Sequence, residues 1–277
     1  MPSWLSTFIS DWLSVSPFFA ISDAIWNALM TACTGLMTTT PQWFSTEAWQ
    51  YVRFELYPWA LSIGIASLNL FFIMGFFKAA SNLKENITLE LLIESLFKLV
   101  VLNVLLVNGL TIITTLFNMS SALAGNVMMM ETPAFFTGDV DAGSRLFFFL
   151  FGLLYFIVAL VCGFLILITL YGRYIKLYVL IVFYPIAMPT LIGGRGVEHT
   201  AYAWGKSFLS NVFEIVTIAL VMGIAGRIVS GITPFTDNAF AEVFDGFAQA
   251  LNSTIYMILM AVSVKGVAAF MNKTFNL

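Results

Sequence analysis

Long apolar stretches, separated by short polar segments, make up most of the chain from residue 57 onward. A membrane-spanning helix needs roughly 20 mainly apolar residues. Five stretches meet this requirement, and they predict spans near residues 57–77, 99–118, 146–170, 207–226 and 247–271. The pattern therefore predicts an all-α fold, in which residues 57–277 form a polytopic membrane helix bundle with five spans.

A sixth apolar stretch, residues 177–193, is shorter and contains Pro185 and Pro189 before it ends in Gly193 and Gly194. Proline lacks a backbone donor and breaks helices. Such backbone survives at membrane depth only where protein or water covers it. We expect a re-entrant segment that turns back at these prolines and glycines, or one that lies along the cytoplasmic boundary.

The first 56 residues are amphipathic rather than uniformly apolar. Trp4, Phe8 and Trp12 recur at helical spacing, with Ser, Thr and Asp on the opposite face. This pattern is typical of helices that lie in the plane of the membrane interface. We therefore expect residues 1–56 to form amphipathic interfacial helices on the outer side.

Two later parts of this segment have patterns of their own. A helix beginning at Pro17 has an apolar stripe that Asp23 and Asn27 interrupt, so it is either interfacial or a further span with a polar lining. The interfacial interpretation is favoured, because an aspartate in mid-span is costly. Residues 42–56 carry Trp43, Trp49 and Tyr51, which suit the headgroup zone.

Basic residues predict the orientation, because cytoplasmic loops carry an excess of Lys and Arg. With the N-terminus outside and five spans, the cytoplasmic side receives Lys78, Lys84, Lys98, Arg173, Lys176, Arg195, Lys206 and Lys273. The outer side receives Arg53, Arg145 and Arg227. Counting 177–192 as a sixth span divides the same charges almost evenly. We therefore expect an outer N-terminus and a cytoplasmic C-terminus.

Composition agrees with a membrane protein. Hydrophobic residues make up 60% of the 277 residues and charged residues 10%, whereas a soluble domain carries about 25% charged residues. Mean hydropathy is +0.93. The net charge of -3 argues against direct, sequence-specific nucleic-acid binding, which needs clustered Lys and Arg.

The sequence offers no pattern of a catalytic or metal site. His199 is the only histidine, so a site with two histidines is excluded. Cys33 and Cys162 lie far apart in apolar stretches. Motifs for zinc proteases, serine hydrolases, P-loops and dinucleotide binding are missing. We expect neither an enzyme nor a cofactor.

Glu214 and Lys265 are the two charges inside predicted spans, and such charges are functional candidates. Each lies eight residues from a cytoplasmic boundary lysine, Lys206 or Lys273, which places both about 12 Å from that face. The two charges could therefore meet at the same depth, on neighbouring antiparallel helices. The pair would either fix the helix register or line a passage or subunit interface.

The run 184–194, YPIAMPTLIGG, is followed by Gly205, Lys206 and Ser207 in a GKSFL sequence at the start of the fourth span. This region resembles the polytopic inner-membrane subunit of type IV secretion and conjugation machines, the TrbL-type family. The resemblance covers about a quarter of the chain. It implies a bacterial inner-membrane platform or channel subunit that supports substrate translocation or pilus assembly.

The resemblance also implies partners: further copies of the chain in a homo-oligomeric ring, membrane lipids, a traffic ATPase, a bitopic channel subunit and pilin. The alternative is a secondary transporter or channel for a small solute. Transporters often have broken helices in both halves, whereas only one broken segment is visible here.

Overall fold

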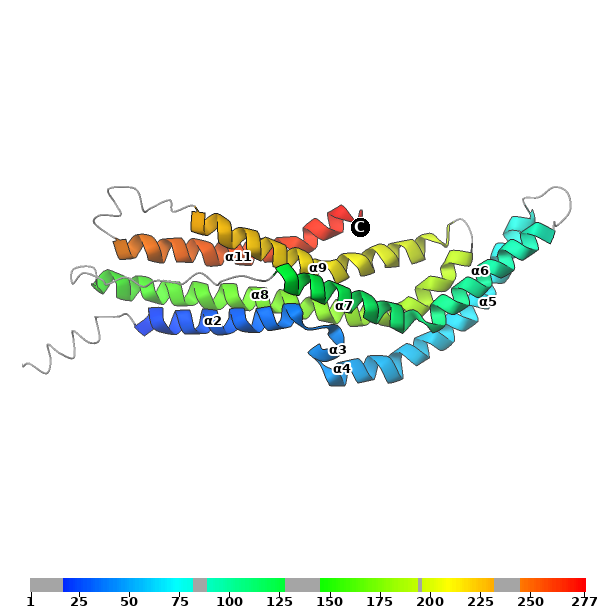
Figure 1. The fold of residues 1–277 in the computed structure, drawn as a ribbon, viewed down its shortest axis with the longest axis horizontal. Helices are drawn as coiled ribbons and strands as arrows, with labels where there is room; N and C mark the ends of the chain where they lie inside the picture. Colours follow the sequence, from blue (N-terminus) through cyan, green and yellow to red (C-terminus); the bar gives the residue numbers. More distant parts are fainter. Residues whose placement is uncertain (1–16, 82–88, 128–144, 194–195, 232–244) are drawn as a thin grey trace, which may run out of the picture. The chain divides into compact units, whose positions relative to one another are not determined.

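The computed structural model describes residues 17–81, 89–127, 145–193, 196–231 and 245–277, and nearly all of them are helical (Figure 1). Its elements are α2 Pro17–Thr38, α3 Pro41–Phe44, α4 Thr46–Tyr51, the π-helix η1 Val52–Leu56, α5 Tyr57–Ser81, α6 Leu89–Val107, α7 Gly109–Val127, α8 Arg145–Ala187, the 3-10 helix η2 Met188–Ile192, α9 His199–Gly231 and α11 Asp245–Thr274. The predicted N-terminal helix with Trp4, Phe8 and Trp12 lies outside the described residues.

The all-α polytopic fold is confirmed. Within the part of the chain that the structure describes, five helical segments are long and apolar enough to cross a membrane: Thr46–Phe77, Gly109–Val127, Phe151–Ile192, His199–Ile228 and Leu251–Thr274. Four of them contain most of a predicted span. The predicted span 99–118 differs, because a turn at Asn108 divides it between α6 and α7.

The segment 177–193 also differs from the expectation. Residues 177–187 continue α8, which runs unbroken for 43 residues, about 65 Å. Pro185 lies inside this helix, near its C-terminal end, where the loss of one backbone hydrogen bond is tolerated. The chain changes to η2 at Met188, and Gly193 closes that turn through a hydrogen bond from its N–H to the Thr190 carbonyl oxygen (3.1 Å). Gly194 lies outside the described residues.

The chain divides into two compact units. The first contains α2, the N-terminal part of α8, and most of α11. One face of α2 is buried within it, at positions spaced three or four residues apart: Ser22, Trp26, Met30, Cys33 and Met37. This spacing is that of a helix packed along its length against neighbours.

Two contacts show how α2 packs in the first unit. The Tyr155 hydroxyl donates to Asp23 Oδ1 at 3.3 Å. A Cβ added to Gly163 would clash with the Leu29 side chain at 2.5 Å. Because both residue numbers rise together, α2 and α8 run parallel and side by side.

The second unit contains α3 to α6, most of α7, the C-terminal part of α8 and the N-terminal part of α9. Helices α5 and α6 form an antiparallel hairpin. Leu68 and Leu102 pack with Ile192 of η2 in one apolar cluster. Gly64 is needed here, because a Cβ at this position would lie 2.2 Å from the Pro185 carbonyl oxygen.

Candidate functional site

A buried arginine joins α8 to α9 in the second unit. Arg173 is only 3% exposed. Its Nε donates to the Asn211 carbonyl oxygen at 2.9 Å, and a terminal nitrogen donates to the Val212 carbonyl oxygen at 3.1 Å. Burying a charge is costly unless hydrogen bonds and an opposite charge compensate it. The two carbonyls supply the hydrogen bonds.

Glu214 supplies the opposite charge. It lies on α9 close in sequence to both acceptors, and its side chain is 3% exposed. Lys176 and Arg173 of α8 are the cations that act on its carboxylate. No basic side chain of the described residues lies within 4.0 Å of it, so the attraction acts over a longer separation. Arg173, Glu214 and Lys176 form a charge cluster between α8 and α9, which we call the α8–α9 cluster.

Of the two charges singled out in the sequence, Glu214 lies at this site and Lys265 does not. Glu214 is buried, as an intramembrane charge with a structural or functional role must be. Lys265 belongs to the other unit and lies on an exposed face of α11. Pairing of Glu214 with Lys265 stays a prediction. Arg173, which the sequence placed at a wet boundary, is instead buried beside Glu214.

Two tyrosines next to Arg173 hold the segment that precedes α4. The Tyr174 hydroxyl donates to the Thr39 carbonyl oxygen at 2.7 Å, and its ring stacks on Phe44 at 4.0 Å between centroids. The Tyr178 hydroxyl donates to the Pro41 carbonyl oxygen at 2.6 Å. Residues 39–44 are therefore fixed to α8 directly beside Arg173.

These contacts bear on the predicted sidedness, which stays a prediction. Residues 42–56 were expected outside, and Arg173 and Lys176 on the cytoplasmic side. The hydrocarbon core is about 30 Å thick, so hydrogen-bonded groups cannot lie on opposite faces of it. Residues 39–44 and Tyr174–Tyr178 must therefore lie at one depth.

The turn that leads into α9 is tied to the same region. Thr190 of η2 donates to the Ala187 carbonyl oxygen at 2.7 Å and accepts from the Ala201 N–H at 3.1 Å. Its hydroxyl therefore satisfies a free N–H in the first turn of α9. The Trp204 indole donates to the Leu180 carbonyl oxygen at 2.9 Å. Gly205, Lys206 and Ser207 lie inside α9, which begins at His199.

The turn at Asn108 is also held by tyrosines. The Tyr184 hydroxyl donates to the Leu105 carbonyl oxygen at 2.7 Å, and that of Tyr57 donates to the Leu106 carbonyl oxygen at 3.4 Å. Both acceptors are in the last turn of α6, where carbonyls lack helical partners. Gly109 leaves room for the Tyr184 ring, which a Cβ would approach to 2.1 Å.

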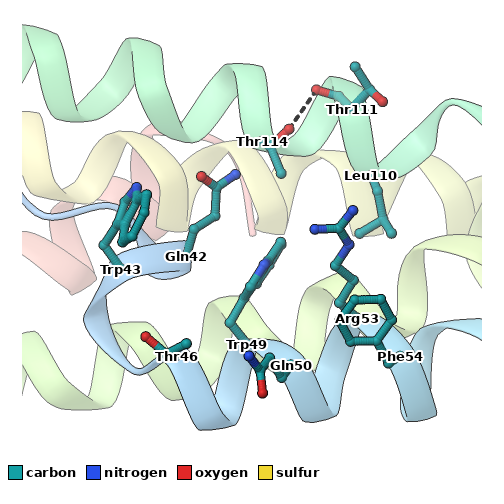
Figure 2. Close-up of a pocket in the computed structure, with 10 residues that line it drawn as sticks. All are labelled: Gln42, Trp43, Thr46, Trp49, Gln50, Arg53, Phe54, Leu110, Thr111 and Thr114. Carbon is teal, nitrogen blue, oxygen red and sulfur yellow. Dashed lines mark hydrogen bonds between the residues drawn. The ribbon is translucent and has the colours of Figure 1, made fainter.

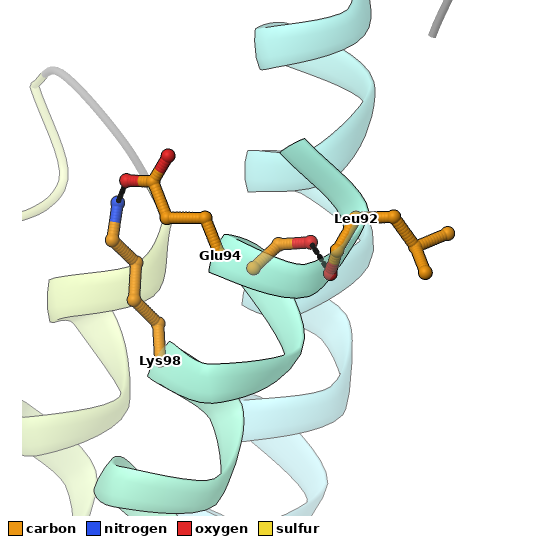
Figure 3. A network of polar contacts seen from close by, with 4 residues as sticks. Leu92, Glu94 and Lys98 are labelled. Carbon is orange, nitrogen blue, oxygen red and sulfur yellow. Dashed lines mark hydrogen bonds and ion pairs between the residues drawn. The ribbon is translucent and has the colours of Figure 1, made fainter. Parts of the chain in front are cut away.

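One charged contact lies apart from this region, on the exposed face of α6. Lys98 Nζ contacts Glu94 Oε1 at 2.7 Å (Figure 3). The hydrogen bond and positive charge of Lys98 hold the pKa of Glu94 below its ordinary value. Both side chains are well exposed, so the pair contributes little to stability. Its exposure makes Glu94 a control for the buried Glu214.

Among the residues that the structure describes, no group of three His, Cys, Asp or Glu side chains lies close enough to hold a metal ion. No protein family, curated protein or solved structure matches the chain.

Proposed function

We propose that the chain is an inner-membrane platform or channel subunit of a bacterial type IV secretion or conjugation machine. The observation that carries this proposal is the α8–α9 cluster, in which Arg173 and Glu214 are buried inside a membrane helix bundle and Lys176 is exposed beside them. Residues 184–209, which resemble the TrbL-type family, form the turn and helix start between Arg173 and Glu214. The resembling segment thus builds the part of the bundle that holds the charges together.

A buried charge cluster suits a subunit whose helices must keep one fixed arrangement while other subunits assemble on it. Replacing such a cluster by apolar side chains is often neutral or stabilising, so burial of Arg173 with Glu214 contributes specificity rather than extra stability. A platform on which other subunits assemble needs this kind of fixed geometry. In this proposal the partners are further copies of the chain, a traffic ATPase, a bitopic channel subunit and pilin.

We further infer that α2, which is not among the five segments apolar enough by themselves, crosses the membrane as an additional span covered by α8. It lies parallel to the part of α8 that contains the predicted third span, and it buries a continuous stripe there. A helix lying in the interface plane would cross that span rather than follow it. Residues 39–56 then reach the cytoplasmic face together with Arg173 and Lys176, and Arg53 joins the cytoplasmic basic residues.

The orientation of the termini is kept in this arrangement. Tyr57 of α5 contacts Leu106 at the far end of α6, so the α5–α6 hairpin returns the chain to the side from which it started. Helices α7, α8, α9 and α11 then cross the membrane in alternating directions. The N-terminus is outside and the C-terminus cytoplasmic, in a bacterial inner membrane.

The test is transfer by cells that lack the gene, complemented with the wild-type chain or with Glu214→Ala. We expect deletion to abolish conjugation or secretion and surface pilin. We expect Glu214→Ala to restore less than a tenth of wild-type transfer, and the control Glu94→Ala to restore it fully. Normal transfer in the deletion strain, with solute uptake by the purified protein in proteoliposomes, would establish the transporter alternative instead.

A further inference from the structure

The second unit contains a pocket of about 550 Å³ between the α3–η1 segment and α7. Figure 2 shows that Gln42, Trp49 and Arg53 project from the α3–η1 segment toward α7, where Thr111 and Thr114 complete the wall. Trp49 and Arg53 are four residues apart, so they share one helix face. The pocket is unrelated to the α8–α9 cluster and was not foreseen from the sequence.

Arg53 is the cation of this pocket. None of the residues lining it is acidic. Glu47 and Glu55 are close in sequence, but within the described part of the chain no carboxylate lies within 4.0 Å of the Arg53 guanidinium. The guanidinium carbon of Arg53 lies over the Phe54 ring, 5.2 Å from the ring centroid. A guanidinium has five N–H donors in a planar fork, which fits the oxygens of a phosphate.

The remaining polar groups also favour an acceptor-rich ligand. The amides of Gln42 and Gln50 and the indole N–H of Trp49 are donors on the pocket wall. Phosphodiester oxygens accept hydrogen bonds and donate none. The Thr114 hydroxyl donates its proton to the Thr111 carbonyl oxygen at 3.0 Å, so it is a donor committed within α7.

Exposed aromatic side chains line part of the pocket. Trp43 is 77% exposed and Phe54 65% exposed, and both belong to the pocket wall. Trp and Tyr concentrate at the level of lipid headgroups, where one part of the ring is apolar and the other is hydrated. A ligand for this place therefore carries a phosphate for Arg53 and an apolar part for the aromatic rings.

We propose that this pocket binds the phosphate headgroup of an anionic phospholipid, with Arg53 as the phosphate ligand and Trp49 beside it. A volume of about 550 Å³ falls within the range of small-molecule sites. It accommodates a glycerophosphate headgroup, and the acyl chains then extend over the exposed apolar surface of α5. The inference is independent of the secretion role.

The test uses the full chain purified in detergent and titrated with phosphatidylglycerol, with bound lipid counted by native mass spectrometry. We expect Arg53→Gln to weaken binding at least tenfold and Trp49→Leu at least threefold. Lys273→Gln removes the same charge from an exposed site at the end of α11 and should change binding less than twofold. Wild-type affinity in Arg53→Gln overturns the proposal.

A second variant and a competition experiment keep the result decisive. Arg53→Lys keeps the charge and loses the planar fork, so it should weaken binding about threefold to tenfold even if Arg53→Gln fails to fold. Glycerol phosphate, which has the headgroup chemistry without acyl chains, should not displace the lipid at millimolar concentration. Displacement by glycerol phosphate would overturn the lipid assignment and identify a site for soluble phosphate compounds.

Discussion

The hydroxyl of Tyr178 donates a 2.6 Å hydrogen bond to the carbonyl oxygen of Pro41, across 137 residues of sequence. Pro41 follows α2, and Tyr178 follows Arg173 on α8. The contact therefore places Pro41 beside the part of α8 that carries the α8–α9 cluster. In the arrangement that we propose, this contact places residues 39–44 on the same side of the membrane as Tyr178.

The first prediction tests this sidedness with single cysteines. Thr46→Cys should be protected from an impermeant thiol reagent in whole cells and should react in inverted membrane vesicles. Thr137→Cys, between α7 and α8 in the sequence, should react from outside. The native Cys33 and Cys162 are buried and give little background. Labelling of Thr46→Cys from outside would return residues 39–56 to the outer face.

The second prediction concerns the charges of the α8–α9 cluster. Glu214→Ala leaves the Arg173 guanidinium buried without the carboxylate that attracts it, and removing one partner of a buried charge pair costs about 3 kcal/mol of unfolding free energy. The purified variant should melt well below wild type in detergent. Glu94→Ala removes an exposed carboxylate and should leave the melting temperature unchanged. Equal melting of both variants would show that Glu214 has no special role.

The third prediction compares two glycines that both lie within helices but differ in the space around them. A Cβ at Gly64 would lie 2.2 Å from backbone of α8, so Gly64→Ala should force α5 away and cost about 2 kcal/mol. A Cβ at Gly205 meets nothing within 4 Å, so Gly205→Ala should stabilise α9 by up to about 1 kcal/mol. Thermal unfolding of the two variants compares them. An unchanged Gly64→Ala would contradict the packing of α5 on α8.

The fourth prediction removes a single hydroxyl. Tyr178→Phe leaves the Pro41 carbonyl oxygen without this donor and should cost about 1 kcal/mol. Tyr202→Phe is the matched control, because Tyr202 is 58% exposed. Proteolysis near residues 39–45 should increase in Tyr178→Phe and stay unchanged in the control. Equal cleavage of both would remove Tyr178 as the group that fixes this segment.

Hydropathy predicted the fold class, because the need for long apolar helices is a local property of the sequence. It missed the division of the second span, although Asn108-Gly109 is a turn dipeptide in the middle of that stretch. It also ended the third span near Leu170, because Arg173 and Lys176 follow there. Pro185 led to a predicted break, whereas the helix continues two residues beyond it.

The candidate site could be predicted only in part. Glu214 was found because a lone acid in an apolar stretch is visible in the sequence. Arg173 was missed, because its burial depends on two carbonyls of α9 about 40 residues away. The Arg53 pocket was missed for the same reason, since its second wall is α7. Sequence periodicity does not show which distant helix covers a given face.

The most direct test of the central claim is the mass of the purified complex in detergent, measured by native mass spectrometry. A platform subunit of a secretion machine should form a closed homo-oligomer of several copies, and Glu214→Ala should reduce it to smaller species while Glu94→Ala leaves it intact. A wild-type monomer that transports a small solute in proteoliposomes would contradict the claim.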